Sequence, residues 1–250
     1  MANSDVVRVL VWDEKPSHAP KDIYPVSING AIAEGLNKLG GGKIVAKTAN
    51  LDDAEQGVTE AALAETDVLI WWGHMRHAEV SDETVRRIVK RVHKEGMGFI
   101  ALHSGHYSKT FQAVVEGHGH LKGGWREMDP PEEEQIHVCA PWHPIAAGIF
   151  DFKLNEEFYG APFDVPPPLQ VIFQSYYPYD QRTFPSGLIW TVGDGKTPGF
   201  ECGPGEGVGE GYGKGRVFYF RPGHETIPTF YNETVRQIIT NGVMWCAHKS

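Results

Sequence analysis

The segment Gly98-Phe99-Ile100-Ala101-Leu102-His103-Ser104-Gly105-His106 joins an apolar run to a tight turn that contains glycine. The apolar half is typical of a strand buried on both faces. If a helix follows the turn, the segment forms a nucleophile elbow, which presents one side chain at a helix N-terminus where anions are favoured. His103 occupies that position; a histidine that only caps the helix is the structural alternative. Ser104 does not fit the serine-hydrolase template, because Leu102 stands where that template has glycine.

Histidine also follows three other segments with the pattern of parallel strands. These segments are 7–14, which leads to His18, 67–72, which leads to His74, and 216–220, which leads to His224. In open α/β sheets, ligands bind in the crevice beyond the carboxyl ends of the strands. We therefore expect the four histidines to converge at one edge of the sheet.

Strand patterns alternate with amphipathic helix patterns over the first ~115 residues, which predicts a parallel sheet with right-handed crossovers. The expected strands are 7–12, 43–49, 67–72 and 98–102, and the expected helices are 27–39, 59–65 and 81–95. Residues 117–215 are interrupted by Gly and Pro and carry short strand patterns at 135–139, 150–154, 169–174 and 188–192. We interpret this region as a β-rich elaboration on the same sheet, completed by a strand at 216–220 and a helix at 232–247. The prediction is a single α/β domain over residues 1–250.

Composition and charge exclude several classes of partner. The chain of 250 residues carries a formal net charge of −9, so nucleic acid is not an expected partner. No apolar run approaches the ~20 residues that span a bilayer, and no basic-then-apolar leader opens the chain. The three cysteines, Cys139, Cys202 and Cys246, lie far apart, which fits a reducing compartment. We expect a soluble cytoplasmic protein with no membrane partner, and a homo-oligomer is plausible because closed homo-oligomers are common.

The glycine-rich run at 203–215 does not have the pattern of a phosphate-binding loop. It contains no G-x-G-x-x-G register, Lys214 is followed by Gly215 instead of Ser or Thr, and a strand pattern comes next instead of a helix. We interpret the run as a surface loop or lid, and we expect no nucleotide cofactor.

Short motifs spread along the chain resemble those of one known family. They are Trp72-Gly73-His74, Ala101-Leu102-His103-Ser104-Gly105, His143-Pro144-Ile145, Glu156-Glu157-Phe158-Tyr159, and Gly215-Arg216-Val217-Phe218-Tyr219 with Gly223-His224. In this order they resemble the ThuA-like, or trehalose-utilisation, family of the class I glutamine amidotransferase-like superfamily, with His103 where that superfamily has its nucleophilic cysteine. The resemblance implies a flavodoxin-like α/β fold and a role in bacterial sugar catabolism. Without the thiolate, glutamine hydrolysis is not expected.

Imidazole and carboxylate groups supply the expected chemistry, because imidazole serves both acid–base catalysis near pH 7 and zinc binding. Neighbouring residues of an extended segment point to opposite sides, so only one of Glu156 and Glu157 can face the crevice, and the resemblance selects Glu157. A solvated acid of an edge strand is the structural alternative. The expected catalytic residues are His103, His224 and Glu157. The expected substrate-binding residues are Asp13, Tyr24, His74, Ser104 and Tyr159, and the expected ligands of a divalent metal, zinc above all, are His18, His74, His103 and His224.

The main hypothesis is an enzyme of sugar utilisation, a hydrolase or isomerase that acts on trehalose, a related disaccharide or a keto-sugar. A metal that polarises a carbonyl or a bound water would assist the histidine and glutamate chemistry. The alternative from another class is a non-catalytic sugar-binding or regulatory protein that keeps the crevice. A residual amidase or glyoxalase-like enzyme is a third hypothesis, and it requires a reactive thiol near the elbow.

Overall fold

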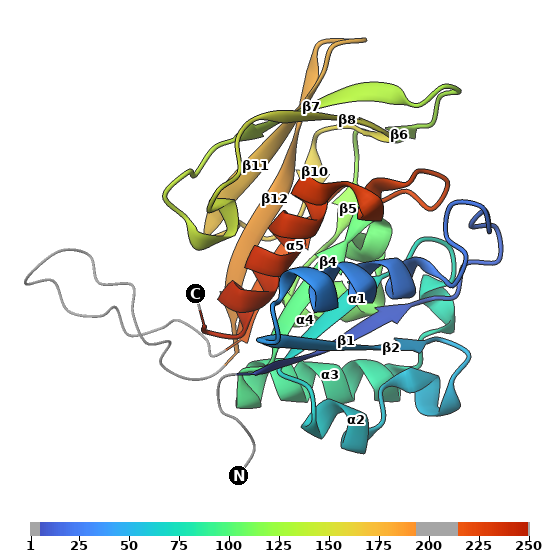
Figure 1. Ribbon diagram of the computed structural model, residues 1–250, viewed down its shortest axis with the longest axis vertical. Coiled ribbons are helices and arrows are strands. Elements are labelled where there is room, and N and C mark those ends of the chain that lie inside the picture. The colour runs from blue at the N-terminus through green and yellow to red at the C-terminus, as the bar shows by residue number, and fades with distance from the viewer. Residues whose placement is uncertain (1–5, 194–214, 250) are drawn as a thin grey trace, which may run out of the picture.

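A nine-stranded sheet with the order β2-β1-β3-β4-β13-β12-β11-β7-β8 is the centre of the structure, a computed structural model that describes residues 6–193 and 215–249 (Figure 1). From β2 to β13 the neighbouring strands are parallel, and from β13 to β8 they are antiparallel. The strands are β1 (Val7–Asp13), β2 (Ile44–Asn50), β3 (Val68–Trp72), β4 (Gly98–Leu102), β7 (Glu132–Val138), β8 (Phe152–Glu156), β11 (Gln170–Tyr177), β12 (Arg182–Val192) and β13 (Gly215–Phe220). The predicted α/β class with a β-rich elaboration is confirmed.

Helices cover both faces of the parallel half. On one face α1 (Ile28–Leu39) and α5 (Glu233–Cys246) lie side by side, as Figure 1 shows in front of the sheet. The other face carries α2 (Glu60–Ala64), α3 (Asp82–Glu95) and α4 (Lys109–Val114). Each face has its own apolar core, and alternate strand residues contribute to the two cores, as the period of a strand requires. Thus Val9 and Val11 pack in the core with α1, whereas Leu10 and Trp12 pack in the other.

The strand β12 is longer than its sequence pattern indicates, because it begins at Arg182 and not near residue 188. Pro185 and Gly187 interrupt the pattern, since both residues are rare inside strands. The pairing of β11 with β12 shifts register on both sides of Phe173, and a Cβ at Gly187 would lie 2.4 Å from the Phe173 ring. An irregularity on the neighbouring strand therefore accommodates the residues that hide this strand in the sequence.

Two small antiparallel sheets lie beside the large one. One pairs β5 (His120–Leu121) with β10 (Phe163–Asp164), and the other pairs β6 (Trp125–Arg126) with β9 (Phe158–Tyr159). In the second, Trp125 is opposite Tyr159. These short pairings bring the loop after α4 back to the segment that follows β8.

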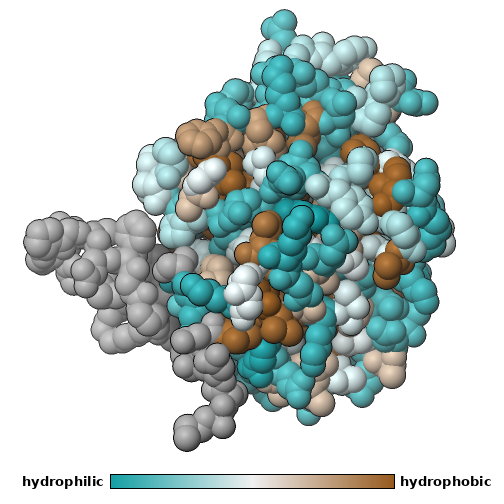
Figure 2. All heavy atoms as spheres, viewed as in Figure 1, coloured by the Kyte–Doolittle hydropathy of each residue, from teal (hydrophilic) through white to brown (hydrophobic). Residues whose placement is uncertain are grey.

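The surface is mixed in polarity. Figure 2 shows a face covered mostly by hydrophilic residues, with hydrophobic residues in small groups between them. Among residues 6–193 and 215–249, no helix has the length and hydropathy needed to cross a membrane. Apart from Gly215, the glycine-rich run predicted as a loop lies outside the described residues, as does Cys202.

Candidate functional site

The turn after β4 presents His103 as the elbow pattern predicts. The five residues His103–Tyr107 form a 3-10 turn, η3, and α4 begins two residues later. His103 itself has φ of 53°, in the left-handed region that residues other than glycine seldom adopt. Such strained backbone tends to occur at functional sites.

The histidines from the other strand ends meet His103 at the same edge of the sheet. The ring centroids of His74, His103 and His224 form a triangle with sides of 5.4, 5.5 and 5.4 Å. His18 adds a fourth ring, with its centroid 5.8 Å from that of His74. The expected convergence of the four histidines is therefore observed.

A cavity of about 640 Å³ opens over this cluster, within the size range of small-molecule sites. It is lined by His18, His74, Met75, His77, Ser104, His106, Tyr107, His120, Leu121, Trp125, Glu127, Glu157, Tyr159, His224, Glu225 and Thr226. These residues come from the ends of β1, β3, β4 and β13 and from the two small sheets. Of the residues that the sequence placed at the site, six line the cavity: His18, His74, Ser104, Glu157, Tyr159 and His224.

His103 lies one layer behind the cavity wall. It is fully buried and is not among the residues that line the cavity, so its expected catalytic role stays a prediction. Its Nε2 lies 3.4 Å from Oε2 of Glu157 and 3.2 Å from the hydroxyl of Tyr159. Burial, with neighbouring His74, His224 and Arg221, lowers the pKa of His103 well below its usual value, so the ring is neutral. His103 therefore supports the wall residues from behind.

The adjacent acids Glu156 and Glu157 have different tasks, as the extended segment predicts. Glu157 lines the cavity and is 3% exposed, while Glu156 is fully buried and accepts hydrogen bonds from the Gly223 amide and the Thr229 hydroxyl. Glu156 thus anchors the loop that carries His224. Burial, together with the charges of Glu156 and Glu225, raises the pKa of Glu157 to about 9, so its carboxyl group carries a proton at neutral pH.

Two contacts with Thr226 orient the ring of His224. Its Nδ1 lies 2.8 Å from the Thr226 hydroxyl and accepts a hydrogen bond from the Thr226 amide at 3.3 Å, and the second contact favours the tautomer with the proton on Nε2. That nitrogen lies 3.6 Å from Glu225 and 3.9 Å from Glu127, two carboxylates of the cavity wall. Burial lowers the pKa of His224, which favours this neutral form. His224 therefore offers an N–H donor to the cavity.

His74 belongs to a chain of polar contacts that ends at His103. Its Nδ1 lies 3.1 Å from the Ser104 hydroxyl, which in turn contacts the Tyr159 hydroxyl. The turn that carries His74 is held by Glu14, whose carboxylate accepts hydrogen bonds from the backbone amides of residues 74–76. Both the ring and its backbone are thus oriented before any ligand binds.

Asp13 and Tyr24 do not belong to the cavity wall, contrary to expectation. The Asp13 carboxylate accepts hydrogen bonds from the Ser27 hydroxyl and the Asn29 amide, so it caps the start of α1. The Tyr24 side chain is fully buried, and its hydroxyl donates to the Ile227 carbonyl at 2.6 Å. Asp13 is the last residue of β1 and Tyr24 lies on the loop after it, but both side chains point into the protein and stabilise the loops.

The expected metal ligands separate into two groups, each completed by a glutamate. His18 and His74 lie with Glu225, and His103 and His224 lie with Glu157; within each group the ligand atoms lie within 4.8 Å of one another. Sequence reasoning missed Glu225, although it directly follows His224 at a strand end. Its position directly after His224, a predicted site residue, was the one feature of the sequence that could have indicated it.

The chain matches the model of the trehalose utilisation family, ThuA, over residues 8–246. It belongs to the ThuA family. No curated protein matches the chain. Membership associates the protein with sugar utilisation and confirms the resemblance seen in the motifs.

Solved structures similar to this ThuA-family protein share its fold. A putative GMP synthase protein from Thermoplasma acidophilum has a TM-score of 0.51 at 14% identity, covering 98% of this chain and 96% of that one. A glutamine amidotransferase from Thermotoga maritima has a TM-score of 0.52 at 11% identity, covering 96% and 98%. A β-galactosidase from Bacillus circulans sp. alkalophilus has a TM-score of 0.54 at 12% identity, covering 97% of this chain and 31% of the enzyme. These identities support the shared fold alone.

Thiol chemistry has no support among the described residues of this ThuA-family chain. Cys139 is exposed and Cys246 is buried, and neither lines the cavity. Burial raises the pKa of Cys246 strongly, which is the opposite of an activated thiol.

Proposed function

We propose that this protein is an acid–base enzyme of sugar utilisation that acts on trehalose, a related disaccharide or a keto-sugar. The observation that carries the proposal is the meeting of Glu157 and His224, from opposite halves of the sheet, on the wall of one cavity. A protonated carboxyl and an imidazole N–H that face the same space supply the donors for acid–base catalysis, and the wall carboxylate of Glu127 supplies a base. Membership of the ThuA family supports a sugar as substrate.

Aromatic side chains at the cavity support the choice of substrate class. Trp125 and Tyr107 line the cavity and are 66% and 50% exposed. Large apolar side chains exposed at a cavity are typical of binding sites, and flat rings suit the C–H faces of sugars. Polar wall residues, such as Glu127 and His120, are available for hydroxyl groups.

Glu157 and His224 on the cavity wall have different roles in the proposed reaction. The buried carboxyl of Glu157 donates its proton to a glycosidic or carbonyl oxygen, while the exposed carboxylate of Glu127 on the same wall accepts the proton lost by the attacking water or by the carbon next to the carbonyl. The Nε2–H of His224 donates a hydrogen bond to a sugar oxygen. Both disaccharide hydrolysis and keto-sugar isomerisation need an acid and a base. His103 and Tyr159 are positioning residues, because they act on the substrate through the wall groups.

Turnover measured by NMR in D2O tests the proposal. The full chain is incubated with trehalose and, separately, with a keto derivative of trehalose; loss of the disaccharide signals reports hydrolysis, and deuterium next to the carbonyl reports isomerisation. Glu157→Gln keeps the shape of the side chain and removes the acid, so the rate falls by about 10²–10⁴-fold. Glu133→Gln is the matched control, because Glu133 is an exposed acid that does not line the cavity.

Two outcomes would overturn the proposal. Sugar binding by calorimetry with no turnover of either compound would identify a non-catalytic sugar-binding protein. A Glu157→Gln variant as fast as Glu133→Gln would remove Glu157 as the acid.

A further inference from the structure

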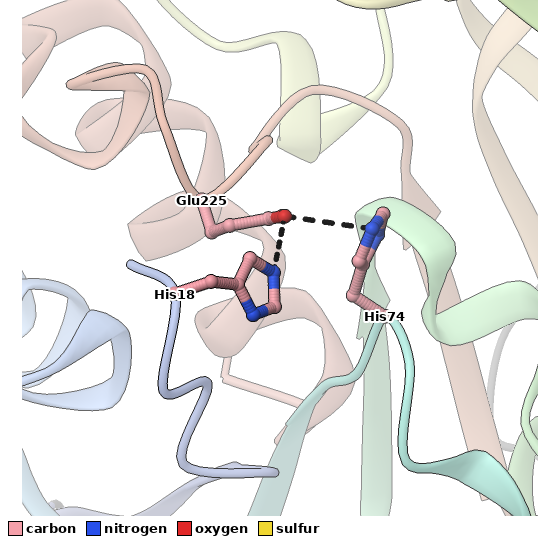
Figure 3. Close-up of side chains that lie close together, drawn as sticks. All are labelled: His18, His74 and Glu225. Atoms are coloured by element: carbon pink, nitrogen blue, oxygen red, sulfur yellow. Dashed lines mark hydrogen bonds and ion pairs between the residues drawn. The ribbon is translucent and has the colours of Figure 1, made fainter. Parts of the chain in front are cut away.

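Three side chains at the mouth of the cavity converge on one point. Figure 3 shows His18, His74 and Glu225 with their polar atoms turned toward one another. Nε2 of His18 lies 2.6 Å and Nε2 of His74 lies 3.4 Å from the same carboxylate oxygen of Glu225. The three residues come from the loops after β1, β3 and β13, so only the folded chain brings them together.

We propose that His18, His74 and Glu225 bind a divalent metal ion of the zinc type. Two imidazoles and one carboxylate form a ligand set for zinc and for other late first-row divalent ions, with open positions left for water or substrate. Zinc holds such ligands at about 2.0–2.2 Å, so two ligand atoms on a tetrahedral ion lie about 3.3 Å apart. The separation of 3.4 Å between His74 and Glu225 already matches.

The contact between His18 and Glu225 has to open to complete the site. The distance from His18 to Glu225 must open by about 0.7 Å to reach the separation that a tetrahedral ion imposes. The His18 side chain is 37% exposed and lies on the loop between β1 and α1, so one side of it faces solvent. The exposure of His18 and His74 to the cavity also provides the path by which the ion enters.

The surroundings of His74 prepare its Nε2 as a ligand. Metal-bound histidines almost always donate their other ring N–H to a neighbouring group, which sets the tautomer and the ring orientation. Nδ1 of His74 has such a partner in the Ser104 hydroxyl at 3.1 Å. With the proton on Nδ1, the lone pair of Nε2 faces Glu225.

Glu225 itself is a carboxylate that lacks a fixed positive partner. Its side chain is 3% exposed, its Oε2 has no hydrogen-bond partner in the described part of the chain, and its ion-pair partners there are all histidines. A buried carboxylate with an unsatisfied oxygen is costly. A divalent cation between Glu225 and the two neutral rings satisfies it.

The second group, His103 with His224 and Glu157, is a weaker metal site. Besides its 2.8 Å contact with the Thr226 hydroxyl, Nδ1 of His224 accepts from the Thr226 amide, which favours the tautomer whose Nε2 carries a proton and not a free lone pair. His103 is fully buried behind the wall. The open group therefore binds the metal, and this buried group keeps the proton-transfer task.

The place of the metal in the reaction rests on the proposed function, whereas metal binding does not. An ion held at His18, His74 and Glu225 faces the same cavity as Glu157 and His224. When bound, it supplies a Lewis acid for a sugar oxygen or a water molecule.

Zinc binding by the purified full chain tests the site directly. The protein is stripped with a chelator, ZnCl2 is added, and stoichiometry is measured by elemental analysis and affinity by competition with a chromophoric chelator. We expect one zinc ion per chain. His18→Ala and Glu225→Gln lower the affinity by about 100-fold or more, and Ser104→Ala, which removes the partner of Nδ1, lowers it by about 10-fold.

Matched controls separate the two histidine groups. His137→Ala removes an exposed histidine that is paired with Asp151 and does not line the cavity, and it leaves the affinity unchanged. Circular dichroism of the metal-free variants checks that each one folds. If Glu157→Gln abolishes zinc binding while Glu225→Gln does not, the ligand set proposed here is wrong.

Turnover by the same samples distinguishes this inference from the proposed function. Zinc bound through His18 and Glu225 without turnover of any sugar would remove the proposed function and keep the metal site. Turnover by protein that binds no zinc would remove the metal site and keep the acid–base enzyme.

Discussion

Arg221 is the buried charge that connects the antiparallel strands to the candidate site. It directly follows β13, is fully buried, donates to the Glu157 carbonyl at 2.7 Å and pairs with the equally buried carboxylate of Glu134 on β7. The guanidinium also lies over the rings of Tyr159 and Tyr177, 5.6 Å from each centroid. Removing this one side chain therefore leaves a buried carboxylate without its cation.

The variant Arg221→Met keeps an unbranched apolar chain and removes the charge. Breaking a buried ion pair from one side costs about 3–5 kcal/mol, because the other charge stays buried and unpaired. For a chain of this size, each kcal/mol lowers the melting temperature by about 2–4 °C, so the expected loss is roughly 6–20 °C. Glu134→Gln removes the stranded charge, so the double variant regains about 1–3 kcal/mol relative to the sum of the single changes.

Urea unfolding followed by tryptophan fluorescence measures these differences. The wild type, the two single variants and the double variant form a double-mutant cycle, which isolates the coupling between Arg221 and Glu134. A loss of less than about 1 kcal/mol for Arg221→Met, or a coupling energy of zero within about 0.5 kcal/mol, would refute the reasoning.

Three further predictions concern stability away from that pair. Gly223 has φ of 135°, and its Cβ would lie 2.4 Å from the Phe230 ring, so Gly223→Ala should cost about 2–4 kcal/mol in urea unfolding; an unchanged midpoint would contradict this. Asn232 caps α5 by accepting from two backbone amides, so Asn232→Ala should cost about 1 kcal/mol, with Asn232→Asp as a control that keeps the cap. Burial raises the pKa of Asp67, but its bonds with Arg8 outweigh burial and hold the pKa below its usual value. The Asp67 contribution is therefore present above the unfolded pKa of about 3.9 and lost as pH falls through the folded pKa. Asp67→Asn should cost about 0.2–1 kcal/mol at pH 7 and progressively less as the pH falls below the unfolded pKa; a cost that does not change with pH would exclude the ion pair as its cause.

The parallel half of the sheet could be predicted from the sequence because its strand and helix patterns depend on residues close together in the chain. Alternation such as Val9 and Val11 against Leu10 and Trp12 follows from the period of a strand, and the helix patterns between strands set the crossovers. The early part of β12 could not be predicted. Its Pro185 and Gly187 are tolerated only because the pairing opposite Phe173 on the neighbouring strand is irregular. Local patterns do not record such compensation.

The sequence predicted where the candidate site lies, but only some of the residues that form it. The rule that strand ends share one edge brings His74 and His224 to the cavity. The same rule does not say which way a side chain turns: Asp13 lies at a strand end and caps α1, and His103 sits behind the wall. Glu225 was missed for the same reason, because its importance depends on His18, a residue 207 positions away in the sequence.

The sequence alone determined the order of strands and helices and the kinds of chemical group at the strand ends. Periodicity and turn chemistry act between near neighbours in the chain, so a local pattern is enough to predict them. Which of those groups face the cavity, which pair with each other and which keep a proton was decided by the tertiary structure. The physical reason is that orientation and desolvation of a side chain are set by segments distant in the sequence, as Arg221, Glu156 and Glu14 show by holding the loops of the site.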